Sequence, residues 1–350
     1  MNLYLLVLFF VVLLLAFYEE YLTEVQKLSI LAVMSVAMIV MATCKDIASV
    51  PDAESYESIF YHYDDPIYQL ATEPTYIYIS HWVLMFGGGI SAVFFIYALL
   101  CIPSKLIMLK EFTPFVFTAM LIYVPVYHEL HDLIQIRAAV AGAFLLVATK
   151  ACIDKKHILT SVACLAATLF HYSSIAFIPF FILGNKQIGK KLKICMMCLV
   201  PLGFAMYFAH KDMLSLLPSS IVSGKVDYYK SSSESGGTWD EMTIPYKNIY
   251  FMVKCMMFYV IIFYYDYLKD KVTCLPILLK IEAGSLFVML GMATIPVVAT
   301  RLSDLYGIVD PILFSYCLYL VKPKYAARIA VACVGAYMLV YNMLVAHYFD

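Results

Sequence analysis

The 350-residue chain is 63% hydrophobic and only 14% charged, with a mean hydropathy of +0.83. Soluble globular proteins average about 45–50% apolar and about 25% charged residues, so the composition excludes a soluble enzyme, a secreted disulfide scaffold and a disordered chain. The net charge of −1 provides no basic field for nucleic acid. Together these observations indicate an integral membrane protein.

Apolar runs extend along the whole sequence. The first, over residues 2–18, has no Lys or Arg before it, and Glu19 and Glu20 follow it in place of a small-residue cleavage site. We therefore expect a permanent span and not a signal peptide. Because a helix that crosses the hydrocarbon core needs about 20 mostly apolar residues, the expected spans are 2–18, 28–44, 87–104, 113–127, 135–150, 158–170, 174–185, 194–210, 248–265, 274–298, 303–321 and 326–346.

These runs predict an all-α polytopic integral membrane protein with one transmembrane domain over residues 1–350. It would have about 10–12 transmembrane helices, with short or re-entrant helices on the external face. The basic residues of the short loops share one face, which is therefore expected to be cytoplasmic: Lys105, Lys110, Lys150, Lys155, Lys156, Lys186, Lys190, Lys191, Lys193, Lys269, Lys271, Lys322, Lys324 and Arg328. The external face carries an acidic segment with short helices over 45–86 and a loop over 211–247.

Two motifs resemble metal sites only superficially. Residues 128–132 (HELHD) lie between two expected spans and lack the spacing of a zinc-protease helix, so we expect a solvated loop there. Residues 195–198 (CMMC) have no second Cys or His pair nearby, which favours helix packing over zinc or redox chemistry. We expect no metal and no other cofactor.

Two helix starts on the external side carry carboxylates and tyrosines. A helix is expected to start over residues 49–56 because a polar residue, an early proline and carboxylates occur together there. Within it, Asp52 and Tyr56 are four residues apart and share a face. Glu73 and Pro74 begin a second helix, with Tyr76 one turn further on and a stop at the glycines 87–89. These residues fit a ligand site, and they also fit helix-dipole compensation and an interfacial aromatic belt.

Only three arginines occur, and Arg328 lies among the cytoplasmic lysines. Arg137 and Arg301 are expected at helix ends on the external side, where a cation is unfavourable unless it is paired or faces an aqueous cavity. Arg301 is followed by Asp304, which could pair with it, and by Tyr306. His171 and Tyr172 lie between two short apolar runs at the same expected depth.

These residue types suit one chemistry. Arginine presents a planar fork of donors that grips phosphate oxygens, and a phosphate at this depth would belong to a lipid phosphate or pyrophosphate. Carboxylates and tyrosines suit a sugar, and a histidine or carboxylate could deprotonate an acceptor hydroxyl. The pattern predicts glycosyl transfer from a polyprenyl-pyrophosphate donor, with His171, Asp52 and Glu73 as alternative bases. The expected substrate-binding residues are Arg137, Arg301, Tyr56, Tyr76, Tyr172 and Tyr306.

In these residues and their order, the chain resembles the EpsG-like branch of the Wzy polysaccharide polymerases over most of its length. The elements that match contain Asp52 with Tyr56, the Glu73 helix, Arg137, His171, and Arg301 with Tyr306. Two positions depart from the family pattern. Lys45 stands where an arginine often precedes the Asp/Tyr pair, and Ala138 stands where glutamine usually follows the arginine.

The resemblance implies an enzyme of the bacterial cytoplasmic (inner) membrane whose site faces the periplasm or exterior. It would join undecaprenyl-pyrophosphate-linked repeat units of an O-antigen or exopolysaccharide, with a Wzz-type chain-length regulator and a Wzx-type flippase as family partners. Two alternatives stay open at this point. One is an O-antigen ligase-type transferase using the same carrier, and the other is a flippase or transporter of lipid-linked oligosaccharide. A transporter should show charge across the whole bilayer, whereas here the candidates gather on one side.

Overall fold

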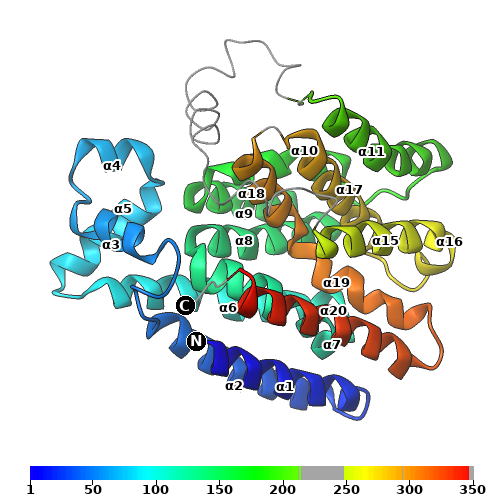
Figure 1. Cartoon of the computed structure of the whole chain (residues 1–350), viewed down its shortest axis with the longest axis horizontal. Coiled ribbons are helices and arrows are strands. Elements are labelled where there is room, and N and C mark those ends of the chain that lie inside the picture. The colour runs from blue at the N-terminus through cyan, green and yellow to red at the C-terminus, as the bar shows by residue number, and fades with distance from the viewer. Residues whose placement is uncertain (212, 214–247, 294, 347–350) are drawn as a thin grey trace. The chain divides into compact units, whose positions relative to one another are not determined.

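The computed structural model describes residues 1–211, 213, 248–293 and 295–346, and the regular elements in these residues are all helices (Figure 1). Five of them are long and apolar enough to cross a membrane: α2 (Glu24–Thr43), α6 (Ile90–Phe112), α8 (Ile136–Ile153), α11 (Lys190–Phe208) and α20 (Lys324–Leu344). Shorter apolar helices accompany them: α1 (Asn2–Tyr18), α9 (His157–Phe170) and α15 (Ile249–Phe263). The predicted all-α polytopic membrane fold is confirmed.

The described chain forms two compact units, residues 1–182 with 311–350 and residues 183–310. The first unit also contains α3 (Ala53–Tyr61), α4 (Pro66–Ala71), α5 (Pro74–Met85), α7 (Val116–Ile122), η1 (Tyr123–Ile134), η2 (Tyr172–Phe177) and η5 (Tyr316–Tyr319). The second also contains α16 (Tyr265–Leu268), α17 (Leu275–Gly291), α18 (Pro296–Tyr306) and η4 (Gly307–Val309). The short helices α10 (Ile178–Leu183) and α19 (Asp310–Ser315) span the boundaries. Nearly all of the expected external loop 211–247 lies outside the described residues.

Local sequence explains where α4 and α5 begin and end. Pro66 and Pro74 occupy the first turn of α4 and α5, where a proline's missing N–H leaves no bond unmade. Asp65 caps α4 by accepting the N–H of Ile67 at 2.8 Å. Gly87 follows α5 with a φ of +72°, a backbone conformation that glycine adopts without strain. The helix start at Glu73 and the stop at the glycines are confirmed.

The expected solvated loop at residues 128–132 is wrong. After α7 the chain continues without a break into η1, a π-helix, and His128, Glu129, His131 and Asp132 are all buried within it. Their polarity misled the prediction because the ionic partner lies elsewhere in the chain. Asp132 accepts a hydrogen bond from Lys105 at 2.6 Å, and neither side chain is exposed. Lys105 is therefore a buried residue of α6 and not a loop lysine.

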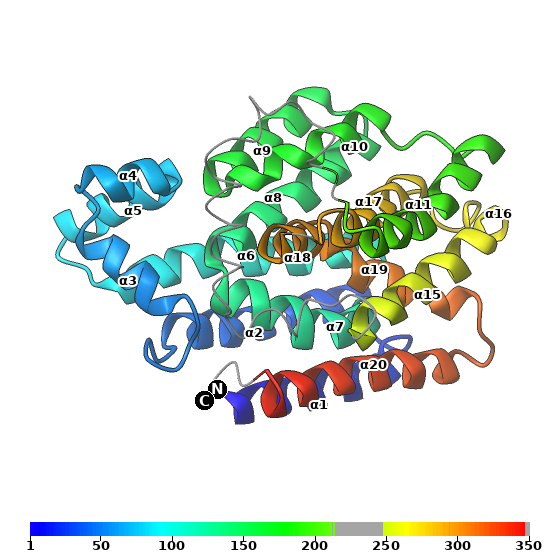
Figure 2. The ribbon, with the colours of Figure 1, turned by 45° about the horizontal axis from the view of Figure 1, so that its top comes forward.

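The first unit is closed by a tight contact between its early and late helices. Helices α1, α7 and α20 pack against one another, and α1 and α20 lie side by side in Figure 2. A Cβ atom at Gly335 of α20 would lie 2.1 Å from the carbonyl oxygen of Leu121 in α7. Only glycine fits so close a backbone approach, a device common where helices pack in membranes.

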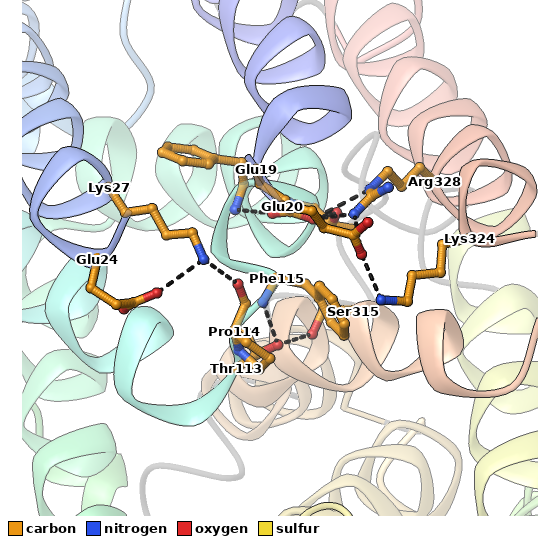
Figure 3. A network of polar contacts seen from close by, with 12 residues as sticks. Glu19, Glu20, Glu24, Lys27, Thr113, Pro114, Phe115, Ser315, Lys324 and Arg328 are labelled. Atoms are coloured by element: carbon orange, nitrogen blue, oxygen red, sulfur yellow. Dashed lines mark hydrogen bonds and ion pairs between the residues drawn. The ribbon is translucent and has the colours of Figure 1, made fainter. Parts of the chain in front are cut away.

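A carboxylate at the end of α1 caps the start of α7 (Figure 3). Glu19 is fully buried and accepts the N–H groups of Phe117 and Thr118 at 3.1 and 3.2 Å. It also pairs with Arg328 of α20 at 3.2 Å. The Glu19 carboxylate thus accepts hydrogen bonds from backbone N–H groups that have no partner within the first turn of a helix. Arg328, expected only as a topology signal beside the lysines, is a buried structural residue here.

Removing this carboxylate should destabilise the protein strongly. Glu19→Ala is expected to lower the free energy of unfolding by about 3–5 kcal/mol. It removes the buried carboxylate that accepts two hydrogen bonds from Arg328 and leaves that buried cation only the partly exposed Glu20 at 3.2 Å. Thermal unfolding of the purified protein in detergent measures the change. Glu24→Gln is the control, since Glu24 is 68% exposed, pairs with Lys27 and Lys110 and not with Arg328, and exposed pairs contribute about 0–1 kcal/mol. Equal losses in the two variants would contradict the assignment.

Candidate functional site

Glu73 is the centre of a cluster of charged and polar groups on the first unit. As the N-cap residue of α5 it does not cap the helix with its own side chain. Its carboxylate instead forms an ion pair with Arg137 and lies 3.1 Å from His171 Nδ1. It also accepts the backbone N–H of Tyr172 at 3.4 Å. Three elements distant in sequence thus converge on one carboxylate that is 5% exposed.

Arg137 lies in the first turn of α8, as its sequence predicted. Its guanidinium lies 5.4 Å from the centre of the Tyr56 ring, and its side chain is 23% exposed. Among the described residues its buried Nε atom has no hydrogen-bond partner. The Tyr56 ring lies 5.6 Å from the Tyr76 ring, and the Tyr76 hydroxyl donates to the Tyr56 carbonyl at 2.7 Å. The arginine therefore retains donor capacity for an anion beside two tyrosine rings.

His171 ends α9 in an extended conformation, and the 3-10 helix η2 follows it. This break between two short helices places the imidazole beside Glu73 with its side chain 17% exposed. A carboxylate at Nδ1 favours the tautomer that carries its proton on Nδ1. The Nε2 lone pair is then available to accept a proton from a ligand.

The charges around Glu73 keep it ionised. Burial alone would raise the pKa of Glu73, but the hydrogen bond from His171 and the charge of Arg137 outweigh burial and lower it to about 2. A general base that works near neutral pH needs a pKa nearer 7. Glu73 is therefore suited to hold and orient its two partners and poorly suited to remove a proton itself.

This depressed pKa predicts a pH-dependent stability. A group whose pKa falls on folding stabilises the native state above its unfolded pKa and loses that contribution as the pH falls through its folded pKa. Because Glu73 moves from 4.5 to about 2, Glu73→Gln is expected to cost about 3 kcal/mol at pH 7. Unfolding measurements should show this difference shrinking between pH 5 and pH 2. Glu54→Gln, exposed on α3, is the control, and a difference that does not change with pH would contradict the model.

Asp52 lies near the cluster in sequence but makes none of its contacts. It is exposed and precedes α3 with a φ of +64°, and its side chain forms no capping hydrogen bond. By position, Asp52 is the N-cap residue of this helix. Lys45, the nearest cation before it, is buried, donates to the Leu133 carbonyl at 2.6 Å and lies 4.0 Å from the centre of the Phe94 ring. Burial lowers the pKa of Lys45 to about 7.

Arg301 and Tyr306 belong to the second unit. Both lie on α18, where Arg301 is exposed and Tyr306 is buried. The expected helix end at Arg301 is wrong, because Pro296 begins a new helix that continues past the arginine to Tyr306. Among the described residues no ion pair joins Arg301 to Asp304.

Sequence reasoning missed two buried polar networks. In η1, Asp132 also binds the Tyr123 hydroxyl at 2.5 Å and His128 Nδ1 at 3.0 Å, and His128 reaches the Tyr4 hydroxyl. In the second unit, Lys254 pairs with Asp310 at 2.9 Å. Lys105, the partner of Asp132, lies beside an expected span, and Lys254 lies inside one. A charged residue in or next to an apolar run was therefore the available signal of a buried ion pair. In the described part of the chain, no group of three or more His, Cys, Asp or Glu residues is placed to hold a metal.

The model of the EpsG family matches residues 28–350 of the chain. The match takes in the helices that carry Glu73, Arg137 and His171. Comparison with curated proteins and with solved structures gave no match.

Proposed function

Because the chain belongs to the EpsG family, a membership that indicates a polysaccharide polymerase, we propose that it joins undecaprenyl-pyrophosphate-linked repeat units. The reaction would occur at the external face of the bacterial cytoplasmic membrane, without metal or nucleotide. The observation that carries the proposal is the Glu73 cluster, in which a guanidinium and an imidazole share one carboxylate. The Tyr56 ring lies against that guanidinium, and the Tyr76 ring packs on Tyr56. In this proposal Arg137 binds the anionic pyrophosphate, His171 acts as the base, and Tyr172 forms the sugar-binding part of the site.

In the proposed reaction, a hydroxyl of the acceptor sugar attacks the anomeric carbon of the donor glycan. The new glycosidic C–O bond forms as the bond from that carbon to the pyrophosphate oxygen breaks. His171 Nε2 takes the hydroxyl proton, and the pyrophosphate leaves on its lipid with the electron pair. Arg137 stabilises the negative charge that develops on this leaving group, a contribution that grows towards the transition state.

Of the three candidate bases, His171 is the one that the geometry supports best. His171 is partly exposed and is oriented by Glu73 through Nδ1, in the arrangement by which a carboxylate orients a catalytic histidine in hydrolases. Glu73 is committed to two partners and serves as a positioning residue. Asp52 is exposed and makes no contact with the cluster, which makes it the second choice for the base.

Tyr56, Tyr76 and Tyr172 are proposed as substrate-binding residues. Tyr172 is 47% exposed and its backbone N–H meets Glu73, so it is the tyrosine proposed to contact the sugar directly. Tyr56 and Tyr76 are buried and are proposed to act by supporting Arg137, because the Tyr56 ring lies against the guanidinium and the Tyr76 ring packs on Tyr56. Arg301 and Tyr306 are proposed as further substrate-binding residues on chemical grounds, because an exposed guanidinium can bind pyrophosphate. A Wzz-type chain-length regulator and a Wzx-type flippase are proposed as partners on family grounds alone.

The proposal is tested with purified protein in vesicles that contain lipid-linked repeat units and no ion gradient. The expected products are a ladder of longer lipid-linked glycans and free undecaprenyl pyrophosphate. Translocation without new glycosidic bonds would favour the transporter alternative. In a deletion strain, restored polymer length supports a polymerase, whereas restored attachment of finished glycan supports a ligase.

A further inference from the structure

An apolar groove of about 380 Å³ lies between the second half of α5 and the first two turns of α6. It is lined by Ile79, Trp82, Val83, Phe86, Ala92 and Ile96. The Trp82 and Phe86 rings stack with their centres 6.2 Å apart, and they are 55% and 78% exposed. The groove is therefore an open apolar surface with a flat aromatic wall.

The composition of the α5–α6 hairpin places this groove in hydrocarbon. Residues 74–104 contain no Asp, Glu, Lys or Arg. The exposed side chains of the hairpin are largely apolar, including Met85, Phe95 and Leu99. Helix α6, which supplies Ala92 and Ile96, is long and apolar enough to cross a membrane. Such a surface is stable only against lipid or against an apolar ligand.

Helix α5 joins the groove to the Glu73 cluster. Glu73 occupies the N-cap position of this helix and Trp82 lies nine residues further on, a separation of roughly 14 Å along the helix axis. A ligand with a pyrophosphate beside Arg137 and a long apolar tail could therefore occupy both places along one helix.

We propose that this groove binds the isoprenoid chain of the donor's lipid carrier. The part of the chain bound there would lie a short way along from its pyrophosphate end. The inference rests on the proposed function in one respect, namely that the pyrophosphate binds beside Arg137. Isoprene units are flat, branched alkenes, and the stacked Trp82 and Phe86 rings offer them a matching flat face. The groove would then help to select a polyprenyl carrier over acyl-chain lipids.

A groove-filling variant tests the proposal. Ala92→Trp places bulk in the groove, and Ser91→Trp places the same bulk on the neighbouring exposed position, which does not line it. The ligands are undecaprenyl pyrophosphate and geranyl pyrophosphate. The two isoprene units of the latter are too short to extend from Arg137 past Trp82. Binding is measured on the full-length protein in phospholipid nanodiscs, by native mass spectrometry or tryptophan fluorescence.

Ala92→Trp should weaken binding of undecaprenyl pyrophosphate about tenfold, through the apolar contact it removes. It should leave geranyl pyrophosphate binding within about twofold, and Ser91→Trp should change neither affinity. Equal affinities of the native protein and Ala92→Trp for the long ligand would overturn the proposal, as would an equal loss for both ligands. Because binding is the readout, absence of turnover in the native protein would count against the proposed reaction and not against the groove.

Discussion

His171→Ala is expected to slow glycosyl transfer by about 10²–10⁴-fold, the usual contribution of a positioned general base. The variant should still bind the lipid-linked donor, because Arg137 and Glu73 keep their ion pair without the imidazole. The rate of the first new glycosidic bond, measured with purified protein and lipid-linked repeat units, reports the loss. The effect should fall on kcat with little change in KM, since the acceptor proton moves only in the transition state.

His157→Ala provides the matched control. His157 is the exposed first residue of the same helix, α9, whose last turn leads to His171. Its loss should leave both rate and stability close to native. If His171→Ala retained the native rate, Asp52 would become the leading base, and Asp52→Asn should then carry the loss.

Arg137→Ala should reduce kcat by about 10²–10³-fold, as removal of one donor to a developing oxyanion does elsewhere. Products should stop at single repeat units on the carrier, as gel separation of the glycans would show. Arg137→Lys should recover only part of the rate, because an ammonium supplies charge without the planar fork that binds two phosphate oxygens.

The Arg137 variants also need a folding control, since Glu73 loses its ion-pair partner. Thermal unfolding of Arg137→Ala and Glu73→Gln separates a loss of stability from a loss of chemistry. A folded Arg137→Ala protein that makes polymer of native length would refute the role of this residue.

The sequence was most informative about those site residues that a local pattern marks individually. Arg137 stood out because a guanidinium at the start of an apolar helix needs a partner, and Pro74 marked the helix that presents Glu73. His171 was visible because two short apolar runs meet there. What the sequence could not supply was the convergence itself, since Glu73 lies 64 residues from Arg137 and 98 from His171.

Errors arose where polarity was read without its partner. Residues 128–132 looked solvated because the ion pair of Asp132 with Lys105 joins two helices. Their polarity predicted that Lys105 and Asp132 would be exposed to water. Both can be buried because each neutralises the charge of the other. Likewise, the break expected at Arg301 assumed that a charge ends a helix, whereas Pro296 had already begun the one that contains it.

The pair of Glu19 and Arg328 has a consequence for biosynthesis. The two residues are separated by 309 positions, so the carboxylate leaves the ribosome long before its cation exists. Until α20 enters the bilayer, α1 and the start of α7 hold an acid with no buried counter-charge. Assembly of the first unit is thus a late event that α20 completes. A nascent chain stalled before α20 is an unfinished fold with an uncompensated acid.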